Sequence, residues 1–228
     1  SSSHTLVGGL VGAAFTHAGA GSIVLPGLIK SIAFIFIAPI IGMIISFIIS
    51  TCVVYIVRNF TPSGVDKVFR KLQLISSSSL SLGHGGNDAQ KSMGIIWAAL
   101  IVSGLATKDD PIALWIILSC QSAIALGTLF GGWRIVKTMG QKITKIKPYE
   151  GFCSETAGAL TLFGSTHFGI PVSTTHTITG AIVGVGARKG ITAVKWGVTR
   201  KIFWAWLLTI PISSVIGSIM YHFFNWIF

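Results

Sequence analysis

Residues 171–184 read "PVSTTHTITGAIVG", and residues 1–12 read "SSSHTLVGGLVG". Both stretches place hydroxyl side chains and a histidine directly before a glycine-rich apolar run. A shift of 172 positions aligns Ser1 with Ser173 without a gap, and the alignment continues into apolar spans that contain Pro39 and Pro211. An offset that stays constant over this length indicates an internal duplication rather than chance similarity.

The composition is that of a membrane protein. Of the 228 residues, 51% are hydrophobic and only 10% are charged, whereas soluble domains carry about a quarter charged residues. Several apolar runs, such as residues 31–57, reach the roughly 20 residues that a helix needs to cross a bilayer. We therefore expect an all-α polytopic membrane protein. The net charge of +11 lies mainly in short loops between apolar runs, which indicates topology rather than a nucleic-acid partner.

The basic loops also predict how the two copies are oriented. Residues 58–73, 134–150 and 188–201 are rich in Lys and Arg and are expected to face the cytoplasm. Residues 16–30 and 106–111 then lie outside. Equivalent loops of the two copies face opposite sides, which predicts an inverted repeat. Many secondary transporters are built in this way, with the binding site between the repeats near the middle of the bilayer.

This orientation divides the chain into three parts. Residues 1–57 are expected to end the first inverted repeat, residues 58–73 to form a cytoplasmic linker, and residues 74–228 to form the second repeat. The first copy would then begin well before Ser1. The expected location is the cell membrane, in many passes through the lipid bilayer, and the bacterial inner membrane is favoured. The sequence leaves a homo-oligomer open.

The stretch at 171–184 belongs to a predicted re-entrant hairpin. Its arms, residues 152–168 and 172–187, are each short for a full crossing and are separated by Gly169 and Pro171. The start of the second arm would present free backbone N–H groups and a positive dipole end to a cavity, and hydroxyls would add donors without fixed charge. This pattern predicts a site for an oxyanion such as phosphate or sulfate. The predicted anion-binding residues are Ser173, Thr174 and Thr175 and, through the duplication, Ser1, Ser2 and Ser3.

A second candidate site lies in "GHGGNDAQKSMG", residues 83–94. A carboxylate inside a membrane segment is costly and is a functional candidate by default. The glycines would permit an unwound backbone whose carbonyls coordinate a cation, so we assign Na⁺ or H⁺ binding to Asn87 and Asp88. Glu155, the only acid in the first hairpin arm, either joins this cation site or lies at the interface. Lys91 either neutralises Asp88, contacts the anion, or extends to the interface.

Two histidines are matched by the duplication, His4 and His176. They either titrate during transport or, as we favour, hydrogen-bond and orient the hairpin tip. A membrane enzyme that uses His176 as a phosphoryl acceptor is a rival interpretation. The sequence shows no acid that would orient this histidine and no metal-ligand spacing beside it. A scaffold subunit is a third interpretation, but it gives no reason for a buried Asn–Asp pair or for paired hydroxyl tips.

The motif "GGNDAQKSMG" and the two S-[ST]-[ST]-H-T tips resemble the inorganic phosphate transporter (Pit) family. The duplicated signature of that family is a Gly-Ala-Asn-Asp segment together with a P-V-S-[ST]-[ST]-H tip, and the resemblance covers nearly the whole chain. It implies a transporter rather than an enzyme, with no cofactor. It implies symport of inorganic phosphate with Na⁺ or H⁺, or transport of neutral metal–phosphate complexes, although some relatives carry sulfate.

The resemblance places the cation motif on Asn87 and Asp88 and the anion-binding tips on the two hydroxyl clusters. The chain departs from the family pattern at Gly86, which replaces the usual Ala, and at Gln90 and Lys91, where many members have small or amide residues. The added positive charge leaves the coupling ion open. The first Asn-Asp segment is not present, so this chain alone is not expected to form a complete site.

Overall fold

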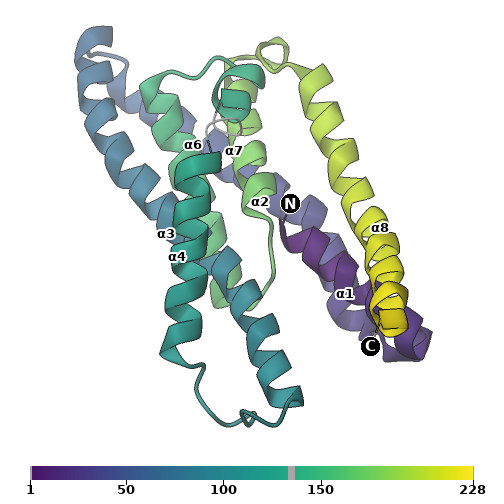
Figure 1. The fold of residues 1–228 in the computed structure, drawn as a ribbon. Helices are drawn as coiled ribbons and strands as arrows, with labels where there is room; N and C mark the ends of the chain where they lie inside the picture. The colour runs from purple at the N-terminus through teal and green to yellow at the C-terminus, as the bar shows by residue number, and fades with distance from the viewer. Residues whose placement is uncertain (1, 133–136, 228) are drawn as a thin grey trace.

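The computed structural model describes residues 2–132 and 137–227, and the regular elements of these residues are all helical (Figure 1). The expected all-α class is confirmed. Three of the helices, α2, α4 and α8, are long and apolar enough to cross a membrane. In chain order the elements are α1 (Ser2–Ala18), η1 (Ala20–Ser22), α2 (Leu25–Val57), α3 (Pro62–Val102), α4 (Leu114–Gly131), η2 (Thr138–Lys142), α6 (Pro148–His167), α7 (Thr174–Lys189), η3 (Ile191–Ala193) and α8 (Trp196–Ile227).

Several helices extend further into the polar segments than the sequence pattern suggests. Helix α3 begins at Pro62, directly after an extended Thr61, so only residues 58–61 connect it to α2. Proline suits the first position of a helix because its fixed φ matches the helix and its missing N–H would have no intrahelical partner. Lys and Arg are also good helix formers. Most of the segment 58–73 is therefore the first turns of a helix.

Helix α3 is also unbroken through its glycines, so the expected unwinding at residues 83–86 is wrong. Gly83 packs against α6, where an added Cβ would lie 3.3 Å from Leu162 Cβ. The close approach of α3 and α6 offsets the roughly 1 kcal/mol that a glycine loses to alanine inside a helix. A continuous helix also keeps every backbone group bonded, which an apolar environment demands. The 41 residues of α3 span about 61 Å.

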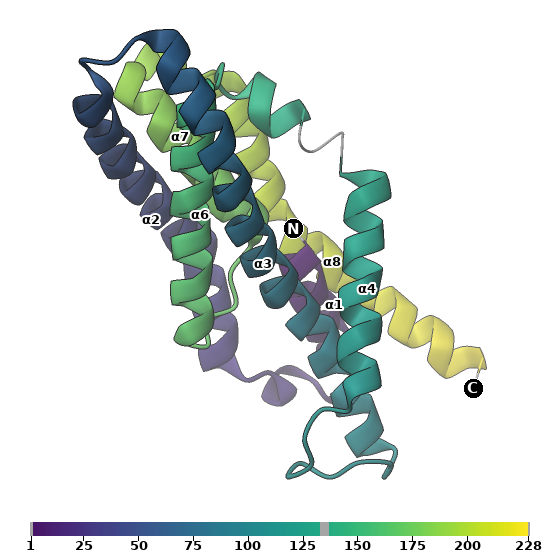
Figure 2. The same cartoon turned by 90° about the vertical axis from the view of Figure 1, so that its left-hand side faces the viewer.

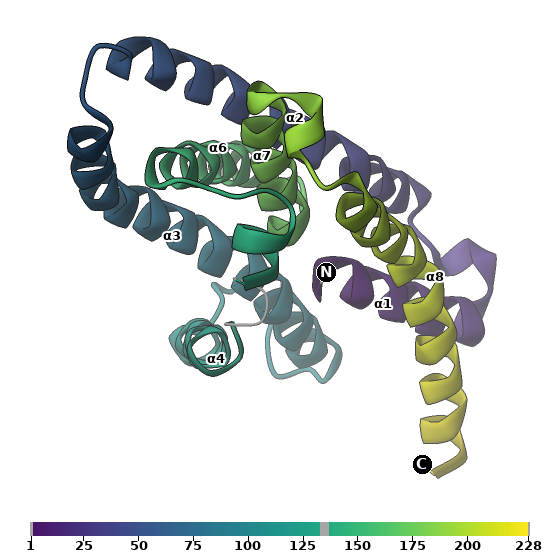
Figure 3. The same ribbon diagram turned by 90° about the horizontal axis from the view of Figure 1, so that it is seen from above.

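Helices α6 and α7 form the predicted pair of short helices joined at a tip. The connecting residues 168–173 lie within the length of the bundle rather than at its end (Figure 1). Gly169 has a φ of 60°, which favours glycine, and Val172 is 1% exposed in a cluster with Leu162 and Ala38. Seen from above, α6 and α7 occupy the centre of the molecule (Figure 3). The tip is thus held by packing inside the fold.

The same order of elements occurs twice, as a helix, a 3₁₀ turn and a long helix with an internal proline. The first set is α1, η1 and α2, and the second is α7, η3 and α8. Each set packs on the other, since α1 lies along α8 and α2 lies along α7. Glycines make both contacts close: a Cβ at Gly8 would collide with Ser213, and one at Gly180 would collide with the Pro39 carbonyl.

Apart from the tip at residues 168–173, the described connections between the long helices gather at two ends of the bundle. Residues 58–61, 143–147 and 190–195 lie at one end, and residues 19–24 and 103–113 lie at the other (Figures 1 and 2). The first three belong to the basic segments of the sequence. The basic segments therefore share one end of the molecule.

Candidate functional site

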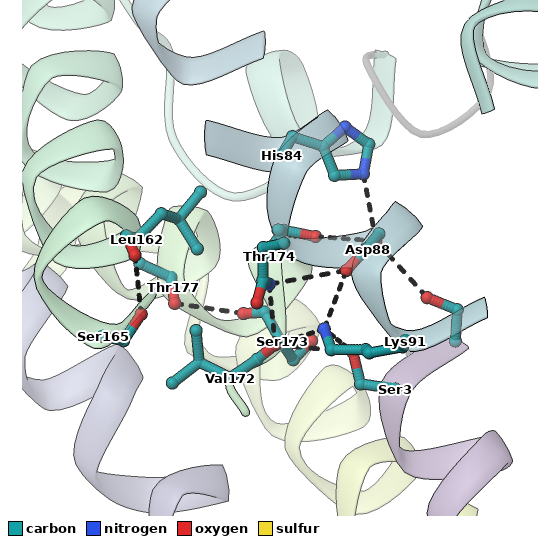
Figure 4. A network of polar contacts seen from close by, with 12 residues as sticks. Ser3, His84, Asp88, Lys91, Leu162, Ser165, Val172, Ser173, Thr174 and Thr177 are labelled. Carbon is teal, nitrogen blue, oxygen red and sulfur yellow. Dashed lines mark hydrogen bonds and ion pairs between the residues drawn. The ribbon is translucent and has the colours of Figure 1, made fainter. Parts of the chain in front are cut away.

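Asp88, about two thirds of the way along α3, is the centre of a polar cluster (Figure 4). Its Oδ2 atom lies 3.2 Å from His84 Nε2 and accepts hydrogen bonds of 3.4 Å from the hydroxyls of Ser2 and Thr174. Its Oδ1 atom lies 3.0 Å from Lys91 Nζ. One carboxylate thus contacts the start of α1, the start of α7 and its own helix.

The backbone carbonyl of Val172 is the second focus of the cluster. It accepts hydrogen bonds from Asn87 Nδ2 at 3.0 Å, Lys91 Nζ at 2.9 Å and Ser3 Oγ at 3.4 Å. Lys91 Nζ also donates to Ser3 Oγ at 2.6 Å. The sequence pattern predicted free backbone carbonyls at the glycines of α3. The structure instead provides such a carbonyl from the non-helical tip between α6 and α7.

Ser173 caps α7, as expected for a hydroxyl residue at this helix start. Its Oγ accepts from the backbone N–H of His176 at 3.3 Å, and its carbonyl accepts from the Thr177 hydroxyl at 3.0 Å. The first N–H groups of a helix have no intrahelical acceptor. The N–H groups of Thr174 and Thr175 therefore form the positive end of α7, and the hydroxyl of Thr174 faces Asp88.

Most of the residues predicted to bind ions lie together. Ser2, Ser3, Thr174, Asn87 and Asp88 share the cluster, with Ser173 capping the helix beside it. Thr175 lies half-buried in the same first turn of α7. Ser1 falls outside the described residues.

Glu155 lies apart from this cluster. Its carboxylate accepts hydrogen bonds from Ser76 Oγ at 2.6 Å and Gln73 Nε2 at 3.2 Å. Ser76 precedes Asp88 by twelve residues on the same helix, which is about 18 Å along the axis. The structure therefore does not bring Glu155 to Asn87 and Asp88, but places it in a separate polar contact between α3 and α6.

Two members of the cluster were not predicted, His84 and the carbonyl of Val172. His84 lies four residues before Asp88, a spacing that puts two side chains on one face of a helix. This spacing is informative only in a helix, and the sequence pattern predicted an unwound segment here. The Val172 carbonyl has no side-chain signature, because any residue at that position would supply the same atom.

The paired histidines meet behind the two tips. The rings of His4 and His176 lie 4.7 Å apart between centroids, and His176 stacks on Trp206 at 4.0 Å. His176 is fully buried. A phosphoryl donor would have no route to a ring enclosed in this way, so the geometry speaks against a phosphoryl-accepting enzyme.

The fold and the cluster together define a class: an all-helical membrane protein of the transporter type, with two hydroxyl-bearing helix starts at a half-buried carboxylate. Comparison with known proteins identifies the family within this class. The chain belongs to the phosphate transporter family, whose family model matches residues 1–217. The expected resemblance is confirmed, and the chain is a member of a transporter family rather than an enzyme.

Individual relatives give the same result. A probable low-affinity inorganic phosphate transporter of Rhizobium meliloti (strain 1021) is 52% identical over 221 residues, covering 97% of this chain and 66% of the relative. One of the same description from Bacillus subtilis (strain 168) is 41% identical, covering 100% and 68%. The solved structure described as the sodium-dependent phosphate transporter matches with a TM-score of 0.66 at 26% identity, covering 99% and 65%. The chain thus spans about two thirds of the length of these relatives.

Proposed function

We propose that the chain forms part of a secondary transporter that moves inorganic phosphate across the membrane together with Na⁺ or H⁺. One observation carries the proposal. The Ser2 hydroxyl from the start of α1 and the Thr174 hydroxyl from the start of α7 both donate to Oδ2 of Asp88. Two helix starts that lie far apart in the sequence therefore face one point, as a small anion would require.

Phosphate would bind between these helix starts. The hydroxyl contacts to Asp88 are long, at 3.4 Å, and hydrogen bonds of this length are weak. The hydroxyls of Ser2 and Thr174 can therefore turn from the carboxylate to an arriving anion at small cost. Free N–H groups at the start of α7 add further donors. A positive charge beside Asn87 and Asp88 would balance the charge of the anion.

The carboxylate favours phosphate over sulfate, the second candidate substrate. At neutral pH, phosphate carries at least one proton on oxygen and can donate a hydrogen bond to Asp88. Sulfate carries none, so its oxygens would meet the carboxylate as a like charge. A site with an acceptor at its centre therefore selects the protonated oxyanion.

Alternating access would follow from the duplication. We infer that residues 1–57 and 74–228 contain parts of two inverted repeats. The repeated order of elements supports this inference, as do the opposite directions in which α1 and α7 run from the centre of the bundle (Figure 1). Rocking of one set of helices against the other would then expose the site first to one side of the membrane and then to the other.

Uptake by the full-length protein in proteoliposomes tests this function. Radiolabelled phosphate would be supplied outside, with an imposed Na⁺ gradient, an imposed pH gradient, or neither. We expect saturable uptake that one of the gradients accelerates and that excess unlabelled phosphate inhibits far more than excess sulfate does. Uptake that neither gradient changes would exclude symport. Equal inhibition by sulfate would remove the assigned selectivity.

A further inference from the structure

The ammonium group of Lys91 lies inside a ring of oxygen atoms. Nζ is 2.6 Å from Ser3 Oγ, 2.9 Å from the Val172 carbonyl oxygen and 3.0 Å from Asp88 Oδ1 (Figure 4). These three oxygens come from α1, from the tip between α6 and α7, and from α3. The side chain is 15% exposed, so the group is held within the protein rather than extended to its surface.

The oxygens match the ammonium one for one. A lysine ammonium has three N–H donors and no acceptor, and each of the three oxygens lies within hydrogen-bond distance. The set is also chemically mixed, with a carboxylate, a hydroxyl and a backbone carbonyl from a non-helical segment. Hard cations are bound in proteins by oxygens of these kinds, and transporters draw on carbonyls of interrupted helices to bind Na⁺.

We propose that the Lys91 ammonium stands in the position of a coupling cation, so that the site binds phosphate with this cation already in place and needs no Na⁺ there. This proposal rests on the proposed phosphate transport, and it states which cation the same site needs in order to bind phosphate. A tethered cation neutralises Asp88 whether or not phosphate is bound. It stays with the protein when phosphate leaves, so this position adds no Na⁺ to the ions carried with phosphate.

Equilibrium binding of radiolabelled inorganic phosphate to the full-length protein tests the proposal. Affinity is measured in NaCl and in choline chloride at equal ionic strength. Wild-type affinity is expected to be the same in the two salts within about twofold. Lys91→Gln, which keeps most of the side-chain length, should bind phosphate about tenfold to a hundredfold more weakly in choline chloride. NaCl should recover most of that loss, because Na⁺ can then occupy the vacated oxygens. Lys108→Gln, in the exposed loop after α3, is the matched control and should behave as wild type.

Each other outcome has a definite meaning. Wild-type affinity that rises tenfold in NaCl would overturn the proposal, and this measurement decides the matter even if Lys91→Gln fails to fold. Weak binding by the variant that NaCl does not recover would also overturn it, because Lys91 would then contact the anion itself. Unchanged binding by the variant in choline chloride has the same consequence. Wild-type protein that binds no phosphate in either salt would instead defeat the proposed function, and this inference with it.

Discussion

At the scale of single residues, the negative charge of Asp88 is what the other groups of the cluster have in common as a partner. Its oxygens face donors on His84, Lys91, Ser2 and Thr174. Asp88→Asn keeps the shape but removes the charge and turns one oxygen into an N–H donor, which would face other donors. We expect phosphate uptake to fall by about tenfold to a hundredfold, measured as the initial rate in proteoliposomes.

The control for this change is Asp109→Asn, which removes the same charge from the exposed loop between α3 and α4. Its uptake should match wild type. Wild-type uptake by Asp88→Asn, in protein that elutes as a single folded species, would remove Asp88 from the ion-binding site.

Two neighbouring hydroxyls at the start of α7 should have separable effects. Ser173 caps the helix through the N–H of His176, so Ser173→Ala should lower the free energy of unfolding by about 1 kcal/mol. Thr174 faces Asp88, so Thr174→Val should weaken phosphate affinity roughly fivefold with little loss of stability. Unfolding in detergent micelles and phosphate binding would be measured on both variants. Equal effects of the two variants on both readouts would contradict this division.

At the scale of helices, the sequence predicted the existence of most elements better than their ends. The two short apolar runs and the Gly169–Pro171 break located the hairpin, because an apolar run needs no tertiary contact to be recognised. The unbroken course of α3 could not be predicted, since it depends on Gly83 packing against Leu162 of a helix about eighty residues away. For the same reason the cluster could be predicted only in part. Asn87 and Asp88 carry a sequence signal, whereas the role of the Val172 carbonyl depends on where the tip folds.

The open end of the hairpin is held by a buried ionic cluster around Glu150 at the start of α6. Glu150 is fully buried; it accepts from Lys189 Nζ at 2.9 Å and from the Tyr149 hydroxyl at 3.0 Å, and Arg188 Nη2 lies 3.8 Å away. Both basic residues come from the end of α7. The cluster therefore ties the two arms together at the end opposite the tip.

Glu150→Gln should loosen this end of the hairpin. The change removes the buried carboxylate that the half-buried Arg188 and the exposed Lys189 face. Breaking a fully buried pair costs about 3–5 kcal/mol, which sets an upper limit on the loss here. We expect a clearly lower midpoint of thermal unfolding in detergent. Asp66→Asn, at the start of α3, serves as a control and should leave the midpoint near that of wild type. A midpoint for Glu150→Gln equal to that of wild type would show that the cluster does not hold the arms.

At the scale of the whole molecule, a duplication would explain why the two helix starts meet. Each of the two sets of elements supplies one short helix, which packs on the long helix of the other set, α1 on α8 and α7 on α2. Because each short helix packs on the long helix of the other set, the starts of α1 and α7 are held in place relative to each other although they lie far apart in the sequence. The paired rings of His4 and His176, which are equivalent residues, lie where the copies meet.

Inversion of the copies makes a specific prediction about topology. Ala20 in η1 and Thr192 in η3 are equivalent under the offset of 172 and are both exposed. In an inverted repeat they lie on opposite sides of the membrane. From the basic residues near Thr192 we expect this residue to lie in the cytoplasm, and Ala20 should then lie outside with Lys108.

Single cysteines at these three positions would be tested with a membrane-impermeant maleimide on intact cells. The background would have the native cysteines replaced, namely Cys52, Cys120 and Cys153. Ala20→Cys and Lys108→Cys should react directly, and Thr192→Cys only after the cells are made permeable. Reaction of Ala20→Cys and Thr192→Cys from the same side would mean that the copies are parallel. Two parallel copies would both direct their helix starts toward one face of the membrane. Inversion could then not explain why Ser2 and Thr174 meet at Asp88.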